Sequence, residues 1–322
     1  MNLIGDHTDY TGGLVLPMAI DRYTVIEGVR GGERIRVTSS DEPVAVDLPL
    51  VIDDPFAVEP SWGRYVAGVV AEVRPSEGFA GSISTDIPIG AGLSSSAALE
   101  VGMALALSAS GTPAEIAELC RRAEHRASGV PCGIMDQLSI AAGVEGHALM
   151  IDCHTLDVVP VRVPDDLEVV VRFVAHRTLV GSPYADRVAE CAAAEREIGP
   201  LRLAGTDDAR RITDPVVRAR AQHVVDENRR VREFADALRA DDRAEVGRLM
   251  REGHRSLAEL YATSNAVMDE AVERMGVLPG VWGVRMTGGG FGGCVVALAE
   301  PGAIEPAHDT WVVRPVAGAH LT

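Results

Sequence analysis

The chain has 322 residues, which is enough for two domains of ordinary size with real hydrophobic cores. Its formal net charge of −17 argues against nucleic acid as a partner, because nucleic-acid binding depends on a basic surface. No apolar run reaches the roughly 18 residues that a membrane span needs, and no signal peptide opens the chain. We therefore expect a cytoplasmic protein without a membrane partner, and any anionic substrate must find a locally positive site.

Two features of the composition bear on the protein's setting. The cysteines are odd in number and lack paired Cys-x-x-Cys spacing, so they are interpreted as buried thiols of a cytosolic protein: Cys120, Cys132, Cys153, Cys191 and Cys294. All 30 basic residues are arginine, because the sequence contains no lysine. Together with heavy use of alanine, valine and glycine, this bias indicates a GC-rich genome.

The first half of the chain predicts short strands broken by glycine and acidic turns. These strands cover residues 14–20, 24–29, 34–38 and 82–87. Helices are predicted at 95–110, 113–128 and 135–142, and further strands at 148–152 and 167–174.

The second half is mostly helical from residue 182 to 275, with apolar residues at helical spacing in 217–238 and 246–260. Strands are predicted at 282–286, 294–299 and 311–316. The mixed order of helices and strands predicts an α+β fold, with a domain boundary near residue 165.

Residues 88–100 read Pro-Ile-Gly-Ala-Gly-Leu-Ser-Ser-Ser-Ala-Ala-Leu-Glu and lead from a predicted strand into a helix. Glycines let the backbone approach a ligand, and the N–H groups of the first helical turn suit a phosphate. No lysine follows the last glycine, so this is not a Walker loop. The hydroxyl of Ser96 could ligate Mg²⁺, and a serine here also suits a helix N-cap; the two roles are compatible.

The chain begins Met-Asn-Leu-Ile-Gly-Asp-His-Thr-Asp-Tyr, with Asp6, His7 and Asp9 within four residues. Carboxylates and an imidazole on one turn can hydrogen-bond several hydroxyls, as sugar binding requires. Taken alone, these residue types favour an acidic surface turn. A metal site is less favoured, because no cysteine or second histidine stands at ligand spacing.

Three isolated residues leave alternatives open. Glu124, on a predicted helix, is either a solvated residue or the carboxylate partner of an Mg²⁺ bound to Ser96. Asp136 either complements the dipole at the start of a helix or accepts a hydroxyl proton as a base. A tyrosine in the position of Tyr184 more often packs than binds a ligand.

Residues 286–294 contain a G-x-G-x-x-G match at Gly288, Gly290 and Gly293. A dinucleotide-binding site requires a helix after this motif. The residues that follow, Cys-Val-Val-Ala-Leu-Ala, are strand-like, so the pattern excludes that kind of site here.

Residues 2–10, 88–100 and 286–294 resemble, in this order, the three motifs of the GHMP small-molecule kinases. Within that superfamily the match is to the galactokinase family, whose signature resembles residues 2–10 and whose catalytic aspartate lies in a stretch resembling 132–137. The likeness continues through 182–191 and 223–228 to 281–298, so it covers most of the chain. The motifs are specific as a set, and any one alone would not be.

The resemblance implies a two-domain GHMP kinase fold with the active site in the cleft between the domains. Residues 1–165 would form the N-terminal domain, with the sugar motif and the ATP loop, and 166–322 the C-terminal domain. ATP would bind the loop residues Gly90, Ala91, Gly92, Leu93, Ser94, Ser95 and Ser96, with Mg²⁺ held by Ser96 and Glu124. The sugar would bind Asp6, His7, Thr8, Asp9, Gly133 and Tyr184. Asp136 would be the catalytic residue that faces the anomeric hydroxyl, and residues 288–293 would support the phosphate region.

The chain departs from the family pattern in two places. Asp6 stands where the family usually has glutamate, and a side chain shorter by one methylene bears on the preference for galactose. The family motif also begins Gly-Arg-Val-Asn-Leu-Ile-Gly, whereas Met1 stands here in the place of valine. Because the GTG codon of valine also serves as a bacterial start, we expect the natural protein to extend upstream with Pro-Gly-Arg and a first strand.

We therefore predict a monomeric, ATP-dependent sugar 1-kinase that phosphorylates galactose, or a related sugar such as N-acetylgalactosamine, arabinose or galacturonate. One alternative is a non-catalytic regulator on the same fold that binds sugar and ATP. It is favoured because the arginine of the family motif, which the resemblance implies stabilises the transferring phosphate, has no counterpart at the start of this sequence. Another is a metal-dependent hydrolase built on Asp6, His7 and Asp9, which leaves the glycine–serine loop unexplained.

Overall fold

The computed structural model describes residues 1–88, 90–176 and 181–322. The chain folds into two compact units, and each is assembled from separate stretches of sequence. The large unit contains Met1–Asp21, Gly90–Leu93 and Val144–Val316, and the small unit contains Arg22–Ile89, Ser94–Gly143 and Ala317–Thr322. The domain boundary expected near residue 165 would divide the chain at one point, whereas each of these units contains three segments. That boundary stays a prediction.

The small unit is built on a four-stranded sheet in the order β2 (Thr24–Arg30), β5 (Phe79–Thr85), β3 (Arg34–Ser39) and β4 (Val46–Pro49). Strand β5 runs antiparallel to β2 and parallel to β3, and β4 is antiparallel to β3. Along β3, Ile35 and Val37 are buried while Arg34 and Arg36 are exposed. This alternation turns one face of the sheet toward a core.

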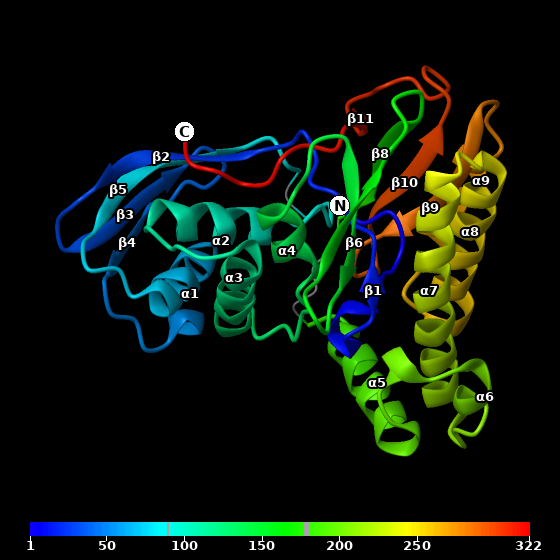
Figure 1. The fold of residues 1–322 in the computed structure, drawn as a ribbon. Coiled ribbons are helices and arrows are strands. Elements are labelled where there is room, and N and C mark those ends of the chain that lie inside the picture. The colour runs from blue at the N-terminus through cyan, green and yellow to red at the C-terminus, as the bar shows by residue number, and fades with distance from the viewer. Residues whose placement is uncertain (89, 177–180) are drawn as a thin grey trace. The chain divides into compact units, whose positions relative to one another are not determined.

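Among the described residues of this unit, four helices accompany the sheet: α1 (Gly63–Val73), α2 (Ser95–Ala106), α3 (Pro113–Ser128) and α4 (Met135–Ala141). Helices α1, α2 and α3 lie together beside the strands (Figure 1), and their apolar side chains share one core with Ile35 and Val37. Helix α3 has the predicted bounds because a capping box fixes its start. The Thr112 hydroxyl accepts from the Glu115 N–H at 3.3 Å, and the Glu115 carboxylate accepts from the Thr112 N–H at 2.7 Å.

The large unit contains two antiparallel sheets. One has the order β1 (Leu14–Val15), β6 (His147–Asp152) and β7 (Val158–Arg162). The other has the order β11 (Thr310–Val313), β8 (Glu168–Ala175), β10 (Gly293–Ala299) and β9 (Val281–Thr287). Every residue of β10 is buried, which explains its continuous apolar sequence.

The helices of the large unit are α5 (Tyr184–Ile198), α6 (Thr206–Ala209), α7 (Pro215–Arg239), α8 (Arg243–Ser256) and α9 (Ala266–Gly276). Helices α8 and α9 pack against β9, and α7 runs alongside α8 (Figure 1). Short 3₁₀ turns occupy Asp9–Thr11, Pro55–Ala57 and Leu201–Leu203. A π-helical turn, Leu257–Tyr261, extends α8 and ends at Ala262, where φ is +53°.

Several predicted boundaries were wrong for identifiable reasons. The strand expected at 14–20 is reduced to β1, since Pro17 has no N–H to give to a ladder. The helix expected to reach residue 110 ends at Ala106, and Ser108 adopts a φ of +68°. Helix α1 was missed because its valines and glycines have low helix propensity; burial of Val66, Val69 and Val70 stabilises it instead. Strands β4 and β7 were missed as well.

No disulfide links the five cysteines, all of which lie in the described part of the chain; Cys120, Cys191 and Cys294 are buried, and the other two are half-buried. The interpretation as buried thiols is therefore confirmed for three of the five. Within the described residues, no helix combines the length and the apolar character that crossing a membrane requires.

A buried ion-pair network fixes the N-terminal segment within the large unit. Arg285, on β9, is fully buried and donates to Asp6 Oδ2 at 2.6 Å and to Glu227 Oε1 at 3.0 Å. Glu227 also accepts from Arg230 Nε at 2.6 Å. Two carboxylates thus face two guanidinium groups inside the protein, which removes the large cost of an uncompensated buried charge.

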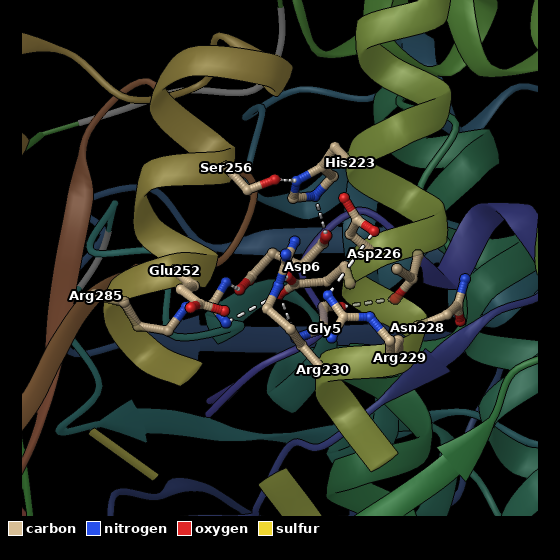
Figure 2. A network of polar contacts seen from close by, with 12 residues as sticks. Gly5, Asp6, His223, Asp226, Asn228, Arg229, Arg230, Glu252, Ser256 and Arg285 are labelled. Atoms are coloured by element: carbon tan, nitrogen blue, oxygen red, sulfur yellow. Dashed lines mark hydrogen bonds and ion pairs between the residues drawn. The ribbon is translucent and has the colours of Figure 1, made fainter. Parts of the chain in front are cut away.

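Helix α7 supplies further contacts to the same segment. Glu227 accepts from the N–H of Gly5 at 3.0 Å, and Asn228 Oδ1 accepts from the N–H of Leu14 at 2.7 Å. Figure 2 shows His223 between Ser256 and Asp6; its ring nitrogens lie 2.8 Å from the Ser256 hydroxyl and 3.2 Å from the Asp6 carbonyl oxygen. Burial lowers the pKa of His223 to about 4, so the ring is neutral near pH 7.

We expect the Arg285→Met variant to lose about 3–5 kcal/mol of unfolding free energy, because it leaves the Asp6 carboxylate buried without its guanidinium partner. Urea denaturation followed by tryptophan fluorescence measures this loss. The control is Arg274→Met, which breaks an exposed pair with Glu270 and should cost less than about 1 kcal/mol. If both variants lost the same unfolding free energy, the buried network would not stabilise the fold more than an exposed ion pair does, and the prediction would be wrong.

Burial raises the pKa of Asp6 to about 6, against the lowering effect of Arg285. The folded protein therefore keeps a proton that the unfolded chain loses near pH 4, so the stability contributed by Asp6 falls as the pH rises to 6. We expect the difference in unfolding free energy between the wild type and Asp6→Asn to shrink by about 2 kcal/mol from about pH 4.5 to 7. Urea unfolding at the two pH values checks this, and a constant difference would contradict it.

Candidate active site

The backbone of the N-terminal motif is held in an unusual conformation. Gly5 has a φ of +99°, and a Cβ there would lie 2.8 Å from the Cα of Val15, so only glycine fits. His7 also has a positive φ, of +66°, which is costly for a residue with a side chain. The 3₁₀ turn that follows ends at Gly12, with a φ of +66°. Such local strain is typical of functional segments that the surrounding structure fixes.

The ring of His7 lies in a cluster of tyrosines within the large unit. Its centroid is 4.6 Å from the ring of Tyr261, 5.6 Å from Tyr184 and 5.9 Å from Tyr10. The Nδ1 atom lies 2.9 Å from the Tyr10 hydroxyl. The structure therefore brings two predicted sugar ligands, His7 and Tyr184, into direct contact.

Asp6 and Thr8, also predicted as sugar ligands, bind other parts of the protein. The Asp6 carboxylate accepts from Arg285 and, at 2.8 Å, from the N–H of Gly288. The Thr8 hydroxyl lies 2.9 Å from the carbonyl oxygen of Gly5 and 2.6 Å from that of Leu14. Asp9, half-buried, is the first residue of the 3₁₀ turn. Their roles toward a sugar stay predictions.

The alternative of a hydrolase metal site on Asp6, His7 and Asp9 is disfavoured by these contacts. Arg285 and Gly288 already bind both oxygens of Asp6, and a guanidinium beside a carboxylate opposes a metal cation. Among the residues that the structure describes, no group of three or more His, Cys, Asp and Glu side chains is placed to hold a metal.

The glycine cluster forms the connection between β9 and β10. Gly288 donates to Asp6, and the N–H of Phe291 donates to the carbonyl oxygen of Thr263 at 2.7 Å. A Cβ on Gly290 would lie 2.6 Å from that same oxygen, so the close approach requires glycine. A strand follows the cluster, as predicted, where a dinucleotide-binding motif requires a helix.

The glycine–serine loop adopts the positive φ values that its glycines permit: +75° at Gly90 and +76° at Gly92. Ser94, the N-cap residue of α2, has a φ of +61° and makes no side-chain capping hydrogen bond. The N-cap interpretation offered for Ser96 was therefore wrong, because Ser96 lies in the first turn of α2 and Ser94 holds the N-cap position. The first-turn N–H groups of α2 still need acceptors, which a bound anion can provide.

A cluster of acidic and polar side chains lies in the small unit, on helices α2, α3 and α4. Glu124 Oε1 accepts from the Ser96 hydroxyl at 3.0 Å, and Glu124 Oε2 accepts from Gln137 Nε2 at 2.6 Å. The same Gln137 nitrogen lies 3.3 Å from Glu100 Oε2. Asp136 is half-buried in the first turn of α4, next to Gln137.

This cluster is electrostatically unfavourable as it stands. Burial, and next the charge of Asp136, raise the pKa of Glu124 to about 7, and its hydrogen bonds offset this only in part. Burial and the charge of Glu124 raise the pKa of Glu100 well above its usual range. Burial and the same two glutamates raise the pKa of Tyr65 to about 12. Within the described residues no arginine pairs with Glu124, so a bound cation would relieve the repulsion.

The residues present fit Mg²⁺. A hydroxyl oxygen and a carboxylate oxygen lie 3.0 Å apart, in a cluster that needs positive charge. Mg²⁺ is usually held by one or two such oxygens together with substrate phosphates and water. The predicted metal ligands Ser96 and Glu124 are thus brought together. Gly133, predicted as a sugar ligand, is buried just before α4 and can offer a sugar only its backbone groups.

Several residues of these two clusters were not predicted: Tyr10, Glu100, Gln137, Tyr261 and Arg285. A signal existed for two of them. Arg285 is an arginine in an otherwise apolar strand, and Gln137 directly follows the predicted catalytic aspartate. Tyr10 and Glu100 end the motifs 2–10 and 88–100 but were given no role there, and Tyr261 carries no local signal, because only the fold brings it close to His7.

Three family descriptions match the sequence. Residues 1–29 match the galactokinase galactose-binding signature, 64–159 the GHMP kinases N terminal domain, and 234–312 the GHMP kinases C terminal domain. Among solved structures, a Lactococcus lactis galactokinase complexed with galactose has a TM-score of 0.91 at 29% identity, covering 98% of this chain and 92% of the other. A mevalonate kinase from Methanococcus jannaschii, with a TM-score of 0.70 at 20% identity, shares the fold over 98% of this chain and 95% of its own.

Curated relatives agree with these matches. Galactokinase from Homo sapiens is 41% identical over 94% of this chain and 82% of its own length. Galactokinase from Chloroflexus aggregans is 40% identical over 99% of this chain and 85% of its own length. The chain therefore belongs to the galactokinase family of the GHMP kinases.

Proposed function

We propose that this protein transfers the γ-phosphoryl group of ATP to the anomeric hydroxyl of galactose, giving galactose 1-phosphate and ADP. The observation that carries the proposal is the pairing of Ser96 with Glu124 at the start of α2, with Asp136 close enough to raise the pKa of Glu124. These residues occur in a chain whose first 29 residues match the galactose-binding signature. A related sugar is the alternative substrate. The cytoplasmic location and the monomeric state of the protein stay predictions.

The ATP phosphates would bind the loop from Gly90 to Ser96. Positive φ values at Gly90, Gly92 and Ser94 turn the backbone so that it can approach a ligand closely. The N–H groups at the start of α2 and the serine hydroxyls then serve as hydrogen-bond donors to phosphate oxygens. Backbone dipoles replace the lysine of other phosphate loops, which this sequence lacks.

Ser96 and Glu124 would hold Mg²⁺, with ATP oxygens and water as the remaining ligands. When bound, the ion neutralises charge on the phosphate oxygens. Gln137 keeps Glu124 oriented by donating to its second oxygen at 2.6 Å, so Glu124 Oε1 stays directed toward Ser96.

Asp136 would accept the proton of the anomeric hydroxyl. As the hydroxyl oxygen forms its bond to the γ-phosphorus, the bond from that phosphorus to the ADP oxygen breaks, and the proton moves to the carboxylate. The sugar itself would be bound by His7, Asp9, Tyr184 and Gly133. Asp6 and Thr8 would support them through their contacts with the protein.

We expect Asp136→Asn to lower kcat about 10²–10⁴-fold, the usual contribution of a general base, with the folded state retained. A coupled ADP-release assay with galactose measures the loss, and circular dichroism monitors the fold. Asp186→Asn, an exposed aspartate in the first turn of α5, is the matched control and should keep full activity. Unchanged turnover in Asp136→Asn would refute the assigned role, and galactose binding without any ADP release by the wild type would favour a non-catalytic regulator.

We expect Glu124→Gln to raise the Mg²⁺ concentration needed for half-maximal activity at least about tenfold, since even residues behind a metal ligand have effects of that size. Binding of Mn²⁺ to the ADP complex, followed by electron paramagnetic resonance, gives a readout independent of turnover. Glu118→Gln, on the same helix, is the control and should bind Mn²⁺ normally. Unaltered Mn²⁺ binding in Glu124→Gln would remove Glu124 from the metal site.

A further inference from the structure

A continuous chain of hydrogen bonds leads away from His7 into the core of the large unit. His7 Nδ1 lies 2.9 Å from the Tyr10 hydroxyl, which lies 2.5 Å from the Tyr261 hydroxyl. The Tyr261 hydroxyl lies 3.0 Å from the sulfur of Cys191. The proposed phosphoryl transfer uses none of Tyr10, Tyr261 and Cys191, so their alignment requires a separate explanation.

The members of this hydrogen-bond chain come from three separate parts of the fold: the N-terminal motif, α5 and the π-helical turn after α8. Tyr261, fully buried, ends the π-helical turn after α8, and its ring lies between His7 at 4.6 Å and His223 at 4.4 Å. The Arg220 guanidinium lies 5.9 Å from the centroid of the same ring. Cys191, on α5, is 1% exposed. Because π-helical turns often occur at functional sites, the placement of Tyr261 favours a role beyond packing.

Cys191, Tyr261 and Tyr10 each have one proton to donate. Burial raises the pKa of Cys191 to about 12 and raises the pKa values of Tyr10 and Tyr261 well above their usual range. The thiol and both phenols are therefore protonated near neutral pH. Because each of these groups has only one proton, every hydrogen bond along the chain must be donated in the same direction. The donors therefore all point either toward His7 or toward Cys191.

The two ends of the chain differ as acceptors. A neutral imidazole nitrogen is a good acceptor, whereas a thiol sulfur is a weak one. The stable direction therefore runs from the Cys191 thiol to the Tyr261 oxygen, from the Tyr261 hydroxyl to the Tyr10 oxygen, and from the Tyr10 hydroxyl to His7 Nδ1. With Nδ1 as acceptor, the neutral ring carries its proton on Nε2.

We propose that Cys191, Tyr261 and Tyr10 are positioning residues that fix His7 as the Nε2–H tautomer. If the proposed function holds, His7 then meets the sugar as a hydrogen-bond donor at Nε2, so it selects a hydroxyl or ether oxygen that can accept. A fixed tautomer lowers the cost of ordering the ring when the sugar binds, so the chain acts on sugar affinity more than on the chemical step.

The first test reads the tautomer directly, without substrate. Long-range ¹⁵N–¹H spectra of the full chain, recorded near pH 8 where an ordinary histidine is neutral, should show a protonated Nε2 and an unprotonated Nδ1 for His7. The His7→Gln variant identifies the signals. In Tyr10→Phe, which removes the donor and keeps the ring, the two tautomers should mix. A wild-type ring protonated on Nδ1, or spectra unchanged in Tyr10→Phe, would overturn the proposal.

The second test separates positioning from packing. Tyr10→Phe should raise the galactose KM about tenfold, the effect of one lost hydrogen bond, with kcat within about twofold of the wild type. Tyr261→Phe keeps the stacked ring and should raise KM in the same direction by a smaller factor. Cys191→Ala probes the far end of the chain if Tyr261→Phe does not fold. The controls are Cys120→Ala, buried in α3, and Tyr23→Phe, 52% exposed, which should leave KM and the His7 spectrum unchanged.

The two tests distinguish failure of this inference from failure of the proposed function. A fixed Nε2–H tautomer in a protein that releases no ADP with galactose would support the positioning chain and refute the kinase. If the protein phosphorylates galactose but Tyr10→Phe changes neither the His7 spectrum nor the galactose KM, the proposed function would stand. The proposal that the hydrogen-bond chain positions His7 would be refuted.

Discussion

The N-terminal motif depends on one fully buried guanidinium. Arg285 lies between the carboxylates of Asp6 and Glu227, and Arg230 balances the second of them. A charge in this position is tolerable only when its partners are fixed at hydrogen-bond distance. The requirement joins β9, α7 and the first residues of the chain at a single point. Because Asp6 and Gly5 are bound there, the neighbouring His7 is held in its strained conformation.

The same constraint gives a physical meaning to aspartate at residue 6, where the family usually has glutamate. The short side chain places one oxygen 2.6 Å from Arg285 and the other 2.8 Å from the Gly288 N–H. A longer side chain with the same backbone would have to displace the guanidinium or the glycine cluster. We infer that the substitution acts first on the position of residues 288–293, and that discrimination between sugars rests more on His7, Asp9 and Tyr184.

The sequence was most informative where structure is determined locally. The capping box at Thr112 and the Asp214–Pro215 start of α7 set helix boundaries within a few residues, and the apolar run of β10 identified a buried strand. The Ser96–Glu124 pair was also predictable, because the family resemblance marks both positions. In contrast, Arg285 meets partners 58 and 279 positions away in the sequence, and Tyr261 meets Tyr10 across 251. No local pattern encodes such contacts, since they form only when distant elements pack.

The two units handle charge in opposite ways, and this difference explains how so acidic a protein can bind a nucleotide. In the large unit, arginines pair with both buried acids of the network: Arg230 and Arg285 hold the pKa of Glu227 far below its usual range despite its burial, whereas at Asp6 burial outweighs Arg285. In the small unit, burial and neighbouring carboxylates raise the pKa values of Glu100 and Glu124, and among the described residues no arginine pairs with Glu124. In a chain with a net charge of −17 and no lysine, we expect the positive charge that this cluster lacks to arrive with the substrate. Under the proposed function, a nucleotide that brings its own cation would meet that requirement, because the cation would relieve the carboxylates while backbone N–H groups would bind the phosphates.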